Sequence, residues 1–169
     1  MAFLNYEFKN LQDLLVYELQ DLYDAEQRLV DALPKMAQAA NAPDLKDAYS
    51  EHLQQTQGHV NRLEEIFTRL ALEPQRETCQ AMTGLIKEGQ DMISAKGDPA
   101  THDAALIAAA QRIEHYEIAA YGSARTFAQQ LGRSDIADIL QQTLDEESTA
   151  DRHLTEIAEG HVNAEAQLS

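Results

Sequence analysis

The sequence predicts an all-α fold, a four-helix bundle with one long crossover connection that carries an extra short helix. The composition favours helix almost throughout, because it is rich in Ala, Leu, Glu and Gln and holds only 7 Gly and 4 Pro among 169 residues. Apolar residues recur at alternating spacings of three and four, which is the pattern of one buried helix face. Turn signals at 41–44 and 131–133 each divide a long amphipathic stretch into a hairpin.

The first hairpin is expected to pair a helix over about 10–40 with a helix over about 45–72. Pro34 should kink or break the first helix, because its ring removes a backbone hydrogen bond at a cost of roughly 3 kcal/mol. Asp44 or its neighbour can cap the second helix. The inward stripes are Leu11, Leu15, Leu22, Leu29, Leu33 and Met36 on the first helix, and Leu45, Ala48, His52, Thr56, His59, Leu63, Ile66 and Leu70 on the second.

The connection over 75–103 contains one shorter helical stretch, at about 79–95, which Gly97, Asp98 and Pro99 end. The second hairpin spans 104–160. Residues 1–160 should form a single domain, whereas 161–169 are polar, lack periodicity and are expected to be a disordered tail. Apolar residues of the connecting helix should seat it on the bundle or on a second subunit: Met82, Leu85, Ile86 and Ile93.

Two glutamates occupy stripe positions where leucine would be expected. Glu117 lies on the stripe of the third long helix and Glu147 on that of the fourth. Each stands fifteen residues from Gly132, so the two should face each other across the hairpin. An unpaired buried carboxylate is costly to keep charged, so these groups must be protonated, paired or bound to metal.

The first hairpin adds a third acid to this layer. Counted from Asn41, Glu26 and Thr56 stand at the same distance and should face each other. Superposing the two hairpins at their turns pairs Glu26 with Glu117, which we interpret as a weak repeat of architecture. Further candidate ligands lie about one turn away: Glu114, His59 and Asp151 on the side far from the loops, and His52 toward the first loop, where an orienting role suits it.

These residue types suit a pair of metal ions. Carboxylate and imidazole groups are ligands for iron and manganese, and bridging carboxylates let two cations lie close together. In di-metal four-helix bundles, two helices each supply one Glu and the other two each supply Glu-x-x-His. This chain has Thr56 at one expected Glu and Ala150 at one expected His, and Asp151 is a candidate substitute. The simpler alternative is a protonated or hydrogen-bonded carboxyl pair that specifies helix register.

Other polar residues near this layer have simpler interpretations. Tyr23, Tyr116 and Tyr121 can hydrogen-bond the ligands or take up oxidising equivalents, but core tyrosines explain them better. The pairs 64–65 and 145–146 are acidic and fall off the stripes, so we interpret them as solvated faces.

The charge and the cysteine count narrow the function classes. A net charge of −16 argues against nucleic acid or an anionic membrane as a partner and suits a protein that attracts cations. The single Cys79 excludes an intramolecular disulfide and a thiolate cluster, and indicates a reducing compartment. The first residues lack the features of a signal peptide, and no apolar stretch approaches the roughly 20 residues of a membrane span. We therefore expect a cytoplasmic protein without membrane contact.

Longer segments resemble a known family. They are DLYDAEQRL at 21–29, HLQQT at 52–56, AMTGLIKE at 81–88, DAALIAAA at 103–110, EHYEIAAYG at 114–122 and LDEESTAD at 144–151. Over roughly residues 8–160 the chain resembles the YciE/YciF stress proteins of the ferritin-like superfamily. The resemblance implies a ferritin-like bundle, a rubrerythrin-like dinuclear metal centre, a homodimer and a role in bacterial stress. It does not supply an established reaction.

The leading hypothesis is a dinuclear metal-binding protein that reacts with oxygen or peroxide under stress, with iron as the first choice of metal and manganese as the second. Whether it is an enzyme stays open, because turnover needs open coordination positions. The alternative is a non-enzymatic helical structural or interaction protein with a degenerate metal site, as Thr56 and Ala150 suggest. A storage ferritin is the least favoured. The candidate ligands are Glu26, His52, His59, Glu114, Glu117, Glu147 and Asp151.

Overall fold

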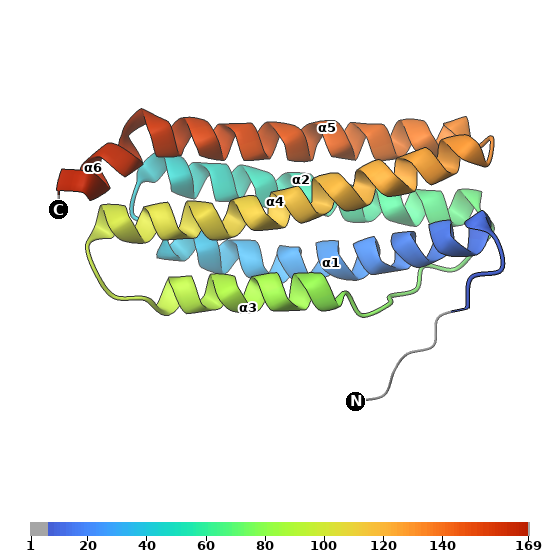
Figure 1. The fold of residues 1–169 in the computed structure, drawn as a ribbon, viewed down its shortest axis with the longest axis horizontal. Helices are drawn as coiled ribbons and strands as arrows, with labels where there is room; N and C mark the ends of the chain where they lie inside the picture. The colour runs from blue at the N-terminus through green and yellow to red at the C-terminus, as the bar shows by residue number, and fades with distance from the viewer. Residues whose placement is uncertain (1–6, 169) are drawn as a thin grey trace.

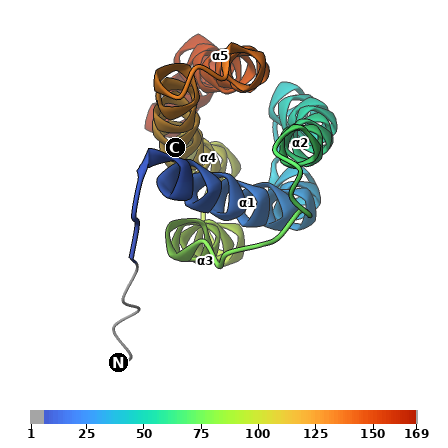
Figure 2. The same cartoon turned by 90° about the vertical axis from the view of Figure 1, so that its right-hand side faces the viewer.

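A computed structural model describes residues 7–168, which form an elongated helical bundle and contain no β-strand (Figure 1). Its long helices are α1 (Leu11–Ala39), α2 (Pro43–Arg69), α4 (Pro99–Gln130) and α5 (Ser134–Ile157). α1 and α2 form one antiparallel hairpin and α4 and α5 the other, and the end-on view shows the four around a common interior (Figure 2). The short α3 (Gln80–Ser94) lies outside them, against α1 and α4. The predicted fold class is confirmed.

Local helix structure differs from expectation in two places. α1 is one helix through Pro34, so the expected break does not occur, because buried residues on both sides of the proline, such as Leu29 and Met36, pack the helix against the core. α4 begins at Pro99, before the expected start near residue 104. The connecting helix already ends at Ser94, and the residues expected to end it start α4 instead, because proline suits the first helical turn and the Asp98 side chain accepts a hydrogen bond from the backbone N of Thr101 at 2.9 Å.

The start of α2 is held by a side chain from α4. Ala42 precedes α2 and offers no side-chain cap. Instead the carboxylate of Asp103, only 2% exposed, accepts hydrogen bonds from the backbone N of Asn41 at 2.8 Å and of Ala42 at 2.7 Å. Asp44, the expected cap, accepts from the backbone N of Leu45. The two hairpins are therefore joined by hydrogen bonds at this end of the bundle.

A buried carboxylate of α1 holds the start of α3 against the bundle. Asp24 on α1 is 3% exposed and accepts a hydrogen bond from the backbone N of Cys79, directly before α3, at 2.9 Å. The same carboxylate pairs with Arg28 at 2.5 Å and Arg76 at 2.8 Å. Sequence analysis did not identify Asp24. The apolar residues expected to seat α3 do so on this chain: Met82 is fully buried, and Leu85, Ile86 and Ile93 pack against the same core.

The described part of the tail is helical, in contrast to the expected disorder after Gly160. A turn of π-helix (Ala158–Val162) follows α5, and α6 (Asn163–Leu168) continues from it. Val162 is 1% exposed in the core, and His161 Nε2 lies 2.8 Å from Asp44 Oδ2. A single inward apolar residue is too little to produce a visible periodicity, so the sequence pattern missed this segment.

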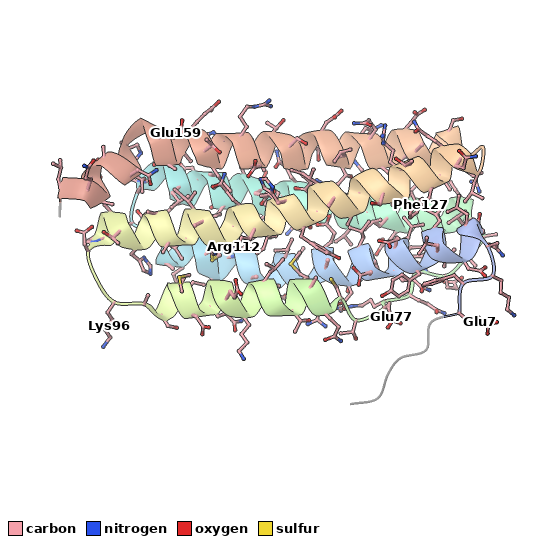
Figure 3. All side chains as sticks on the ribbon, in the orientation of Figure 1. Glu7, Glu77, Lys96, Arg112, Phe127 and Glu159 are labelled. Carbon is pink, nitrogen blue, oxygen red and sulfur yellow. The ribbon has the colours of Figure 1, made fainter. Side chains whose placement is uncertain are left out.

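The core consists of two apolar clusters, one toward each end of the bundle. One includes Leu33, Leu45, Leu106 and Ile157, and the other includes Leu15, Phe67, Tyr121 and Ile136. Charged side chains such as Lys96 and Glu159 project from the outer surface (Figure 3). None of the helices formed by residues 7–168 is both long enough and apolar enough to cross a membrane.

Candidate metal centre

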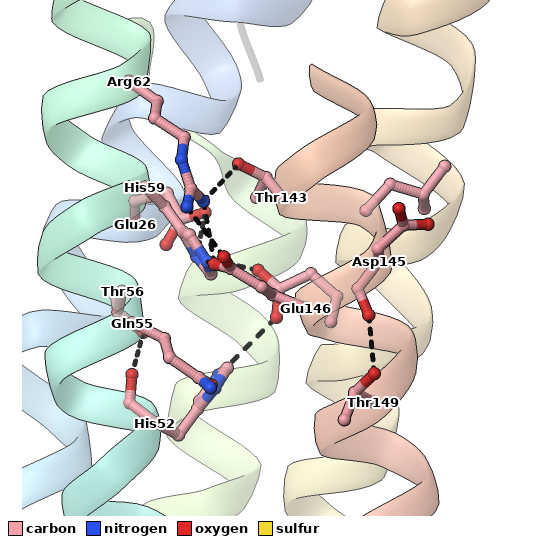
Figure 4. Close-up of polar contacts among 12 residues, drawn as sticks. Glu26, His52, Gln55, Thr56, His59, Arg62, Thr143, Asp145, Glu146 and Thr149 are labelled. Atoms are coloured by element: carbon pink, nitrogen blue, oxygen red, sulfur yellow. Dashed lines mark hydrogen bonds and ion pairs between the residues drawn. The ribbon is translucent and has the colours of Figure 1, made fainter. Parts of the chain in front are cut away.

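A layer of titratable side chains lies between the two apolar clusters. Every long helix contributes to it, and each of its members is at most 6% exposed. The stripe positions that broke the apolar pattern therefore do point inward. The six members are Glu26 from α1, His52 and His59 from α2, Glu114 and Glu117 from α4, and Glu147 from α5. Figure 4 shows part of this layer.

The six side chains form two groups that share Glu147. The first group is Glu26, His59 and Glu147, and the second is His52, Glu114, Glu117 and Glu147. In each group, one ligand atom per residue lies within 4.8 Å of all the others. A carboxylate common to both groups is the arrangement that lets two cations lie close together.

Most ligand atoms of the two groups have no hydrogen-bond partner. Among residues 7–168, eight of ten unpartnered buried side-chain nitrogen and oxygen atoms belong to these six residues. His59 Nδ1 lies 3.0 Å from Glu147 Oε1 and 3.3 Å from Glu26 Oε1, yet none of these contacts has hydrogen-bond geometry. Buried polar atoms in folded proteins normally have partners. Such a concentration of unpartnered oxygen and nitrogen ligands fits cations held between them.

The outward nitrogen of each histidine has an acceptor. His59 Nε2 lies 2.8 Å from Glu146 Oε2, and Arg62 donates two hydrogen bonds to the same carboxylate, at 2.8 and 2.7 Å (Figure 4). His52 Nδ1 lies 3.2 Å from Gln55 Oε1. Both inward nitrogens are left for the two groups. Metal-bound histidines typically donate their second ring N–H to such an acceptor, which fixes the ring orientation.

Two carboxyl groups of the layer have raised pKa values when no metal is bound. Burial raises the pKa of Glu117 well above the usual carboxyl value, and the charges of Glu147 and Glu26 raise it further. Burial, followed by the charge of Glu147, likewise raises the pKa of Glu114. Both residues therefore favour the protonated form. A cation would reverse this preference, because it stabilises the charged carboxylate.

His59 and Glu147 behave in the opposite way. Burial alone would lower the pKa of His59, but its contacts with Glu147 and Glu26 raise it to about 11. Burial likewise opposes ionisation of Glu147, while the contact with His59 and the charge of His52 lower its pKa overall. Without metal, these pKa shifts favour an imidazolium at His59 beside a charged Glu147. Binding a cation through His59 Nδ1 requires the loss of that proton.

Two positions of the general di-metal pattern carry no ligand. The Thr56 hydroxyl donates to the backbone O of His52 at 2.9 Å, so it is engaged by its own helix. Asp151, the candidate substitute beside Ala150, belongs to neither group. Its carboxylate accepts a hydrogen bond from Gln111 at 3.1 Å and approaches His115 at 3.2 Å. One residue further along a helix turns the side chain by about 100°, which carries Asp151 toward the surface.

The missing nitrogen of the pattern is supplied from another helix. His52 was expected to play an orienting part, but its Nε2 lies 3.3 Å from Glu114 Oε1 and 3.7 Å from Glu147 Oε2. Both histidines of the layer therefore come from α2, and their ring centroids are 6.3 Å apart. Each group holds one imidazole.

Glu146 is a functional candidate that sequence analysis missed. The sequence placed it on a solvated face, but in the structure it is half-buried at the edge of the layer. The hydrogen bond from Arg62 lowers the pKa of Glu146, which keeps a charged acceptor beside His59. The only signal in the sequence was an acid next to a stripe position on one helix and an arginine three residues after a stripe histidine on another.

The three tyrosines near the layer differ in their partners. Tyr121 is fully buried and donates to Glu26 Oε1 at 2.5 Å, so it contacts a member of the first group. Tyr116 contacts Asp21 and Cys79 instead. Tyr23 donates to Glu64 at 2.7 Å, which shows that Glu64 is more than a solvated side chain.

Residues 10–167 match a family of proteins known as DUF892, a domain of unknown function. The chain is 41% identical to protein YciF of Escherichia coli over 160 residues, which cover 94% of this chain and 96% of that protein. The crystal structure of the E. coli stress protein YciF superposes with a TM-score of 0.89 and covers 92% of this chain and 99% of that one. These similarities extend over nearly the whole bundle.

More distant structures show how widely the fold occurs. YcfI of Rhodopseudomonas palustris, which carries a provisional description as a structural protein, is 39% identical with a TM-score of 0.87, covering 90% of this chain and 98% of that one. Ferritin-like di-iron carboxylate proteins from Bacillus anthracis superpose with a TM-score of 0.65 at 15% identity, covering 89% of this chain and 99% of theirs. At that identity the likeness establishes the ferritin-like fold alone.

Proposed function

This chain belongs to the DUF892 family, and on that premise we propose that it is a ferritin-like protein that binds two divalent metal ions in the polar layer of its bundle. The observation that carries the proposal is the set of eight unpartnered ligand atoms, which converge from four helices and form two groups around Glu147. A layer built only to specify helix register would be expected to satisfy its own hydrogen bonds.

Each group would hold one ion. Glu26 and His59 would bind the first ion, and His52, Glu114 and Glu117 the second, with Glu147 available to both. Iron is the metal we propose first and manganese the second, because mixed carboxylate and imidazole ligands suit both. Two ferrous ions would together supply the two electrons that reduce hydrogen peroxide to water or oxygen to peroxide.

The protein surroundings would support that chemistry. The apolar clusters on either side of the layer lower the local dielectric constant and strengthen the electrostatic interactions inside it. Tyr121 holds Glu26 in place through its hydroxyl. Glu114 and Glu117, which favour protonation without metal, would give up their protons as the ions bind.

The physiological setting is proposed from the relatives. E. coli YciF is described as a stress protein, and we propose a role in the bacterial stress response for this chain as well. A cytoplasmic location and a homodimer complete the proposal. Light scattering coupled to size-exclusion chromatography tests the dimer directly, and the mass of a monomer would contradict this part of the proposal.

Elemental analysis of protein from iron-supplemented cells tests metal binding. We expect about two ions per chain, as in other di-metal bundles, and well under one in the double variant Glu117→Gln/Glu147→Gln. The control is Glu88→Gln/Asp91→Asn, which removes two exposed acids from α3 and should retain the wild-type content. Wild-type protein with less than about 0.2 ions per chain, after reconstitution as well, would contradict the proposal.

A structural or interaction protein is the second candidate, and the positions Thr56 and Ala150 favour it because they lack ligands that the general pattern provides. On this view chelators leave the melting temperature of the wild type unchanged. The proposed function predicts instead that the melting temperature falls when metal is removed and recovers when it is restored.

A further inference from the structure

A chamber opens between α2 and α5, and its inner end reaches the second group. Its volume is about 340 Å³, and His52 and Glu114 form part of its lining. Tyr49, Gln55 and Ala150 line it as well. The chamber is therefore a path between solvent and two candidate ligands of one ion.

Two buried polar atoms in the lining have no partner. His52 Nε2 is one and the Tyr49 hydroxyl is the other, and these residues are 6% and 2% exposed. A buried tyrosine hydroxyl normally has a hydrogen-bond partner. Water molecules or a hydrated ion inside the chamber would give His52 Nε2 and the Tyr49 hydroxyl a partner.

Ala150 explains why space remains here. The general di-metal pattern places a histidine at this position of α5, and a methyl group stands in its place. The ring that would otherwise complete the ligand set is absent from the chamber wall. His52 supplies the nitrogen from the opposite wall instead, so the substitution removes bulk without removing an imidazole from the second group.

The lining near solvent offers exchangeable ligands for a cation. Glu51, His153 and Glu156 are exposed there, with His153 Nδ1 3.7 Å from Glu156 Oε2. Arg152 also lines the chamber, and its guanidinium donates to Thr149 at 3.1 Å. The two exposed acids, Glu51 and Glu156, outnumber the single arginine, and the whole chain carries a net charge of −16. Such a cleft attracts cations and raises their local concentration.

We propose that this chamber is the path by which a hydrated divalent cation reaches the metal centre. Its volume corresponds to about ten water molecules at the density of the liquid, which leaves room for an ion with its first hydration shell. Glu51, His153 and Glu156 replace part of that shell near solvent, and His52 and Glu114 receive the ion inside. The inference rests on the proposed function, since it assumes a metal centre to be filled.

The first test narrows the chamber. Apo-protein is mixed with Co²⁺ in a stopped-flow instrument, and the visible absorption of the bound ion reports uptake. Ala150→Leu keeps a strong helix former but adds bulk to the lining, and should slow uptake about tenfold or more while leaving the final Co²⁺ content unchanged. Ala108→Leu, on the exposed face of α4, is the matched control and should load at the wild-type rate.

The second test changes charge without changing volume. Glu51→Gln/Glu156→Gln should slow uptake several-fold, roughly 3 to 10 times, at low ionic strength and weaken the dependence of the rate on salt. The control Glu88→Gln/Asp91→Asn raises the net charge equally but lies on α3, outside the chamber. It should retain the wild-type rate.

The outcomes separate the two proposals. Wild-type protein that takes up no metal at equilibrium contradicts the metal centre itself. If the wild type binds metal, and both Ala150→Leu and the charge variant take it up at the wild-type rate, the chamber is not the path, whereas the proposed metal centre still stands. If Ala150→Leu lowers the final content, the charge variant decides, because it leaves the side chain at 150 unchanged.

Discussion

Replacing Glu117 by leucine should stabilise the metal-free protein and reduce its response to metal. Glu117 is fully buried, and neither of its carboxylate oxygens has a hydrogen-bond partner. Its pKa is raised by burial and by the neighbouring acids, so the metal-free protein is destabilised as the pH rises above the usual carboxyl value of 4.5. Leucine removes both the unpartnered atoms and the cost of protonating a carboxyl when it is buried at neutral pH.

The magnitude follows from the burial. Replacing buried ionic groups by apolar ones of similar volume often stabilises proteins by about 1–4 kcal/mol, and we expect about 2 kcal/mol here. For a chain of this length, each kcal/mol moves the melting temperature by about 2–4 °C, so the metal-free variant should melt about 4–8 °C above the metal-free wild type. Wild-type protein at about 100 times the Kd of its metal should itself gain about 2.7 kcal/mol.

Thermal unfolding followed by circular dichroism, with and without chelator, measures both effects. The gap between the metal-free proteins should narrow as the pH falls to 4.5 and below, because Glu117 is then protonated in the unfolded state as well, and the remainder reflects its unpartnered polar atoms. Glu117→Gln serves as the control, since it needs no proton in order to be buried neutral but keeps two polar atoms, and it should gain less. A metal-free leucine variant that melts below the wild type, together with a wild type indifferent to metal, would refute the reasoning.

Three other experiments test the proposed centre and the attachment of α3. Glu146→Gln should weaken metal binding about 10–100-fold in chelator competition, because His59 loses its charged acceptor, whereas unaltered affinity would argue against that role. Asp24→Asn should lower the free energy of unfolding in denaturant by about 1–3 kcal/mol near neutral pH. Burial would raise the pKa of Asp24, but the hydrogen bonds from Arg28 and Cys79 outweigh it and lower the pKa from its usual value of 3.8. The contribution of Asp24 to stability should therefore be lost as the pH falls below 3.8. A difference between the variant and the wild type that does not depend on pH would contradict this. Metal loading near pH 7 should release at least about one proton per chain to an indicator dye, because the pKa of His59 is about 11 without metal, and loading without proton release would count against His59 as a ligand.

Much of the fold and part of the centre could be predicted from the sequence. Stripe spacing located the long helices, and counting from the turns correctly indicated that Glu117 and Glu147 share a layer with Glu26. This works because the two helices of a short hairpin are antiparallel, so distance from the turn is also height along the axis. The ends of the helices were harder to predict, because Asp98 and Pro99 were expected to end the connecting helix and instead start α4.

The details of the candidate site could not be predicted from the sequence, because they depend on how one hairpin packs against the other. Turn counting fixes height within a hairpin but not the axial shift between hairpins, which is why His52 enters the layer. It also cannot fix rotation, and rotation carries Asp151 out toward Gln111. Glu146 was missed for a related reason: a residue beside the stripe faces solvent on an isolated helix, but here it faces Arg62 across the bundle.

The origin of both imidazoles from α2 also has a mechanical consequence. His59 follows His52 by seven positions, which is close to two helical turns, so the two rings project from one side of a single helix. Their spacing is set by the pitch of one helix and would persist if the two hairpins slid past each other. A single inserted or deleted residue between them would rotate one ring by about 100° and remove it from the layer. The proposed two-ion site therefore constrains the number of residues between His52 and His59 more strictly than the lengths of the loops at either end of α2.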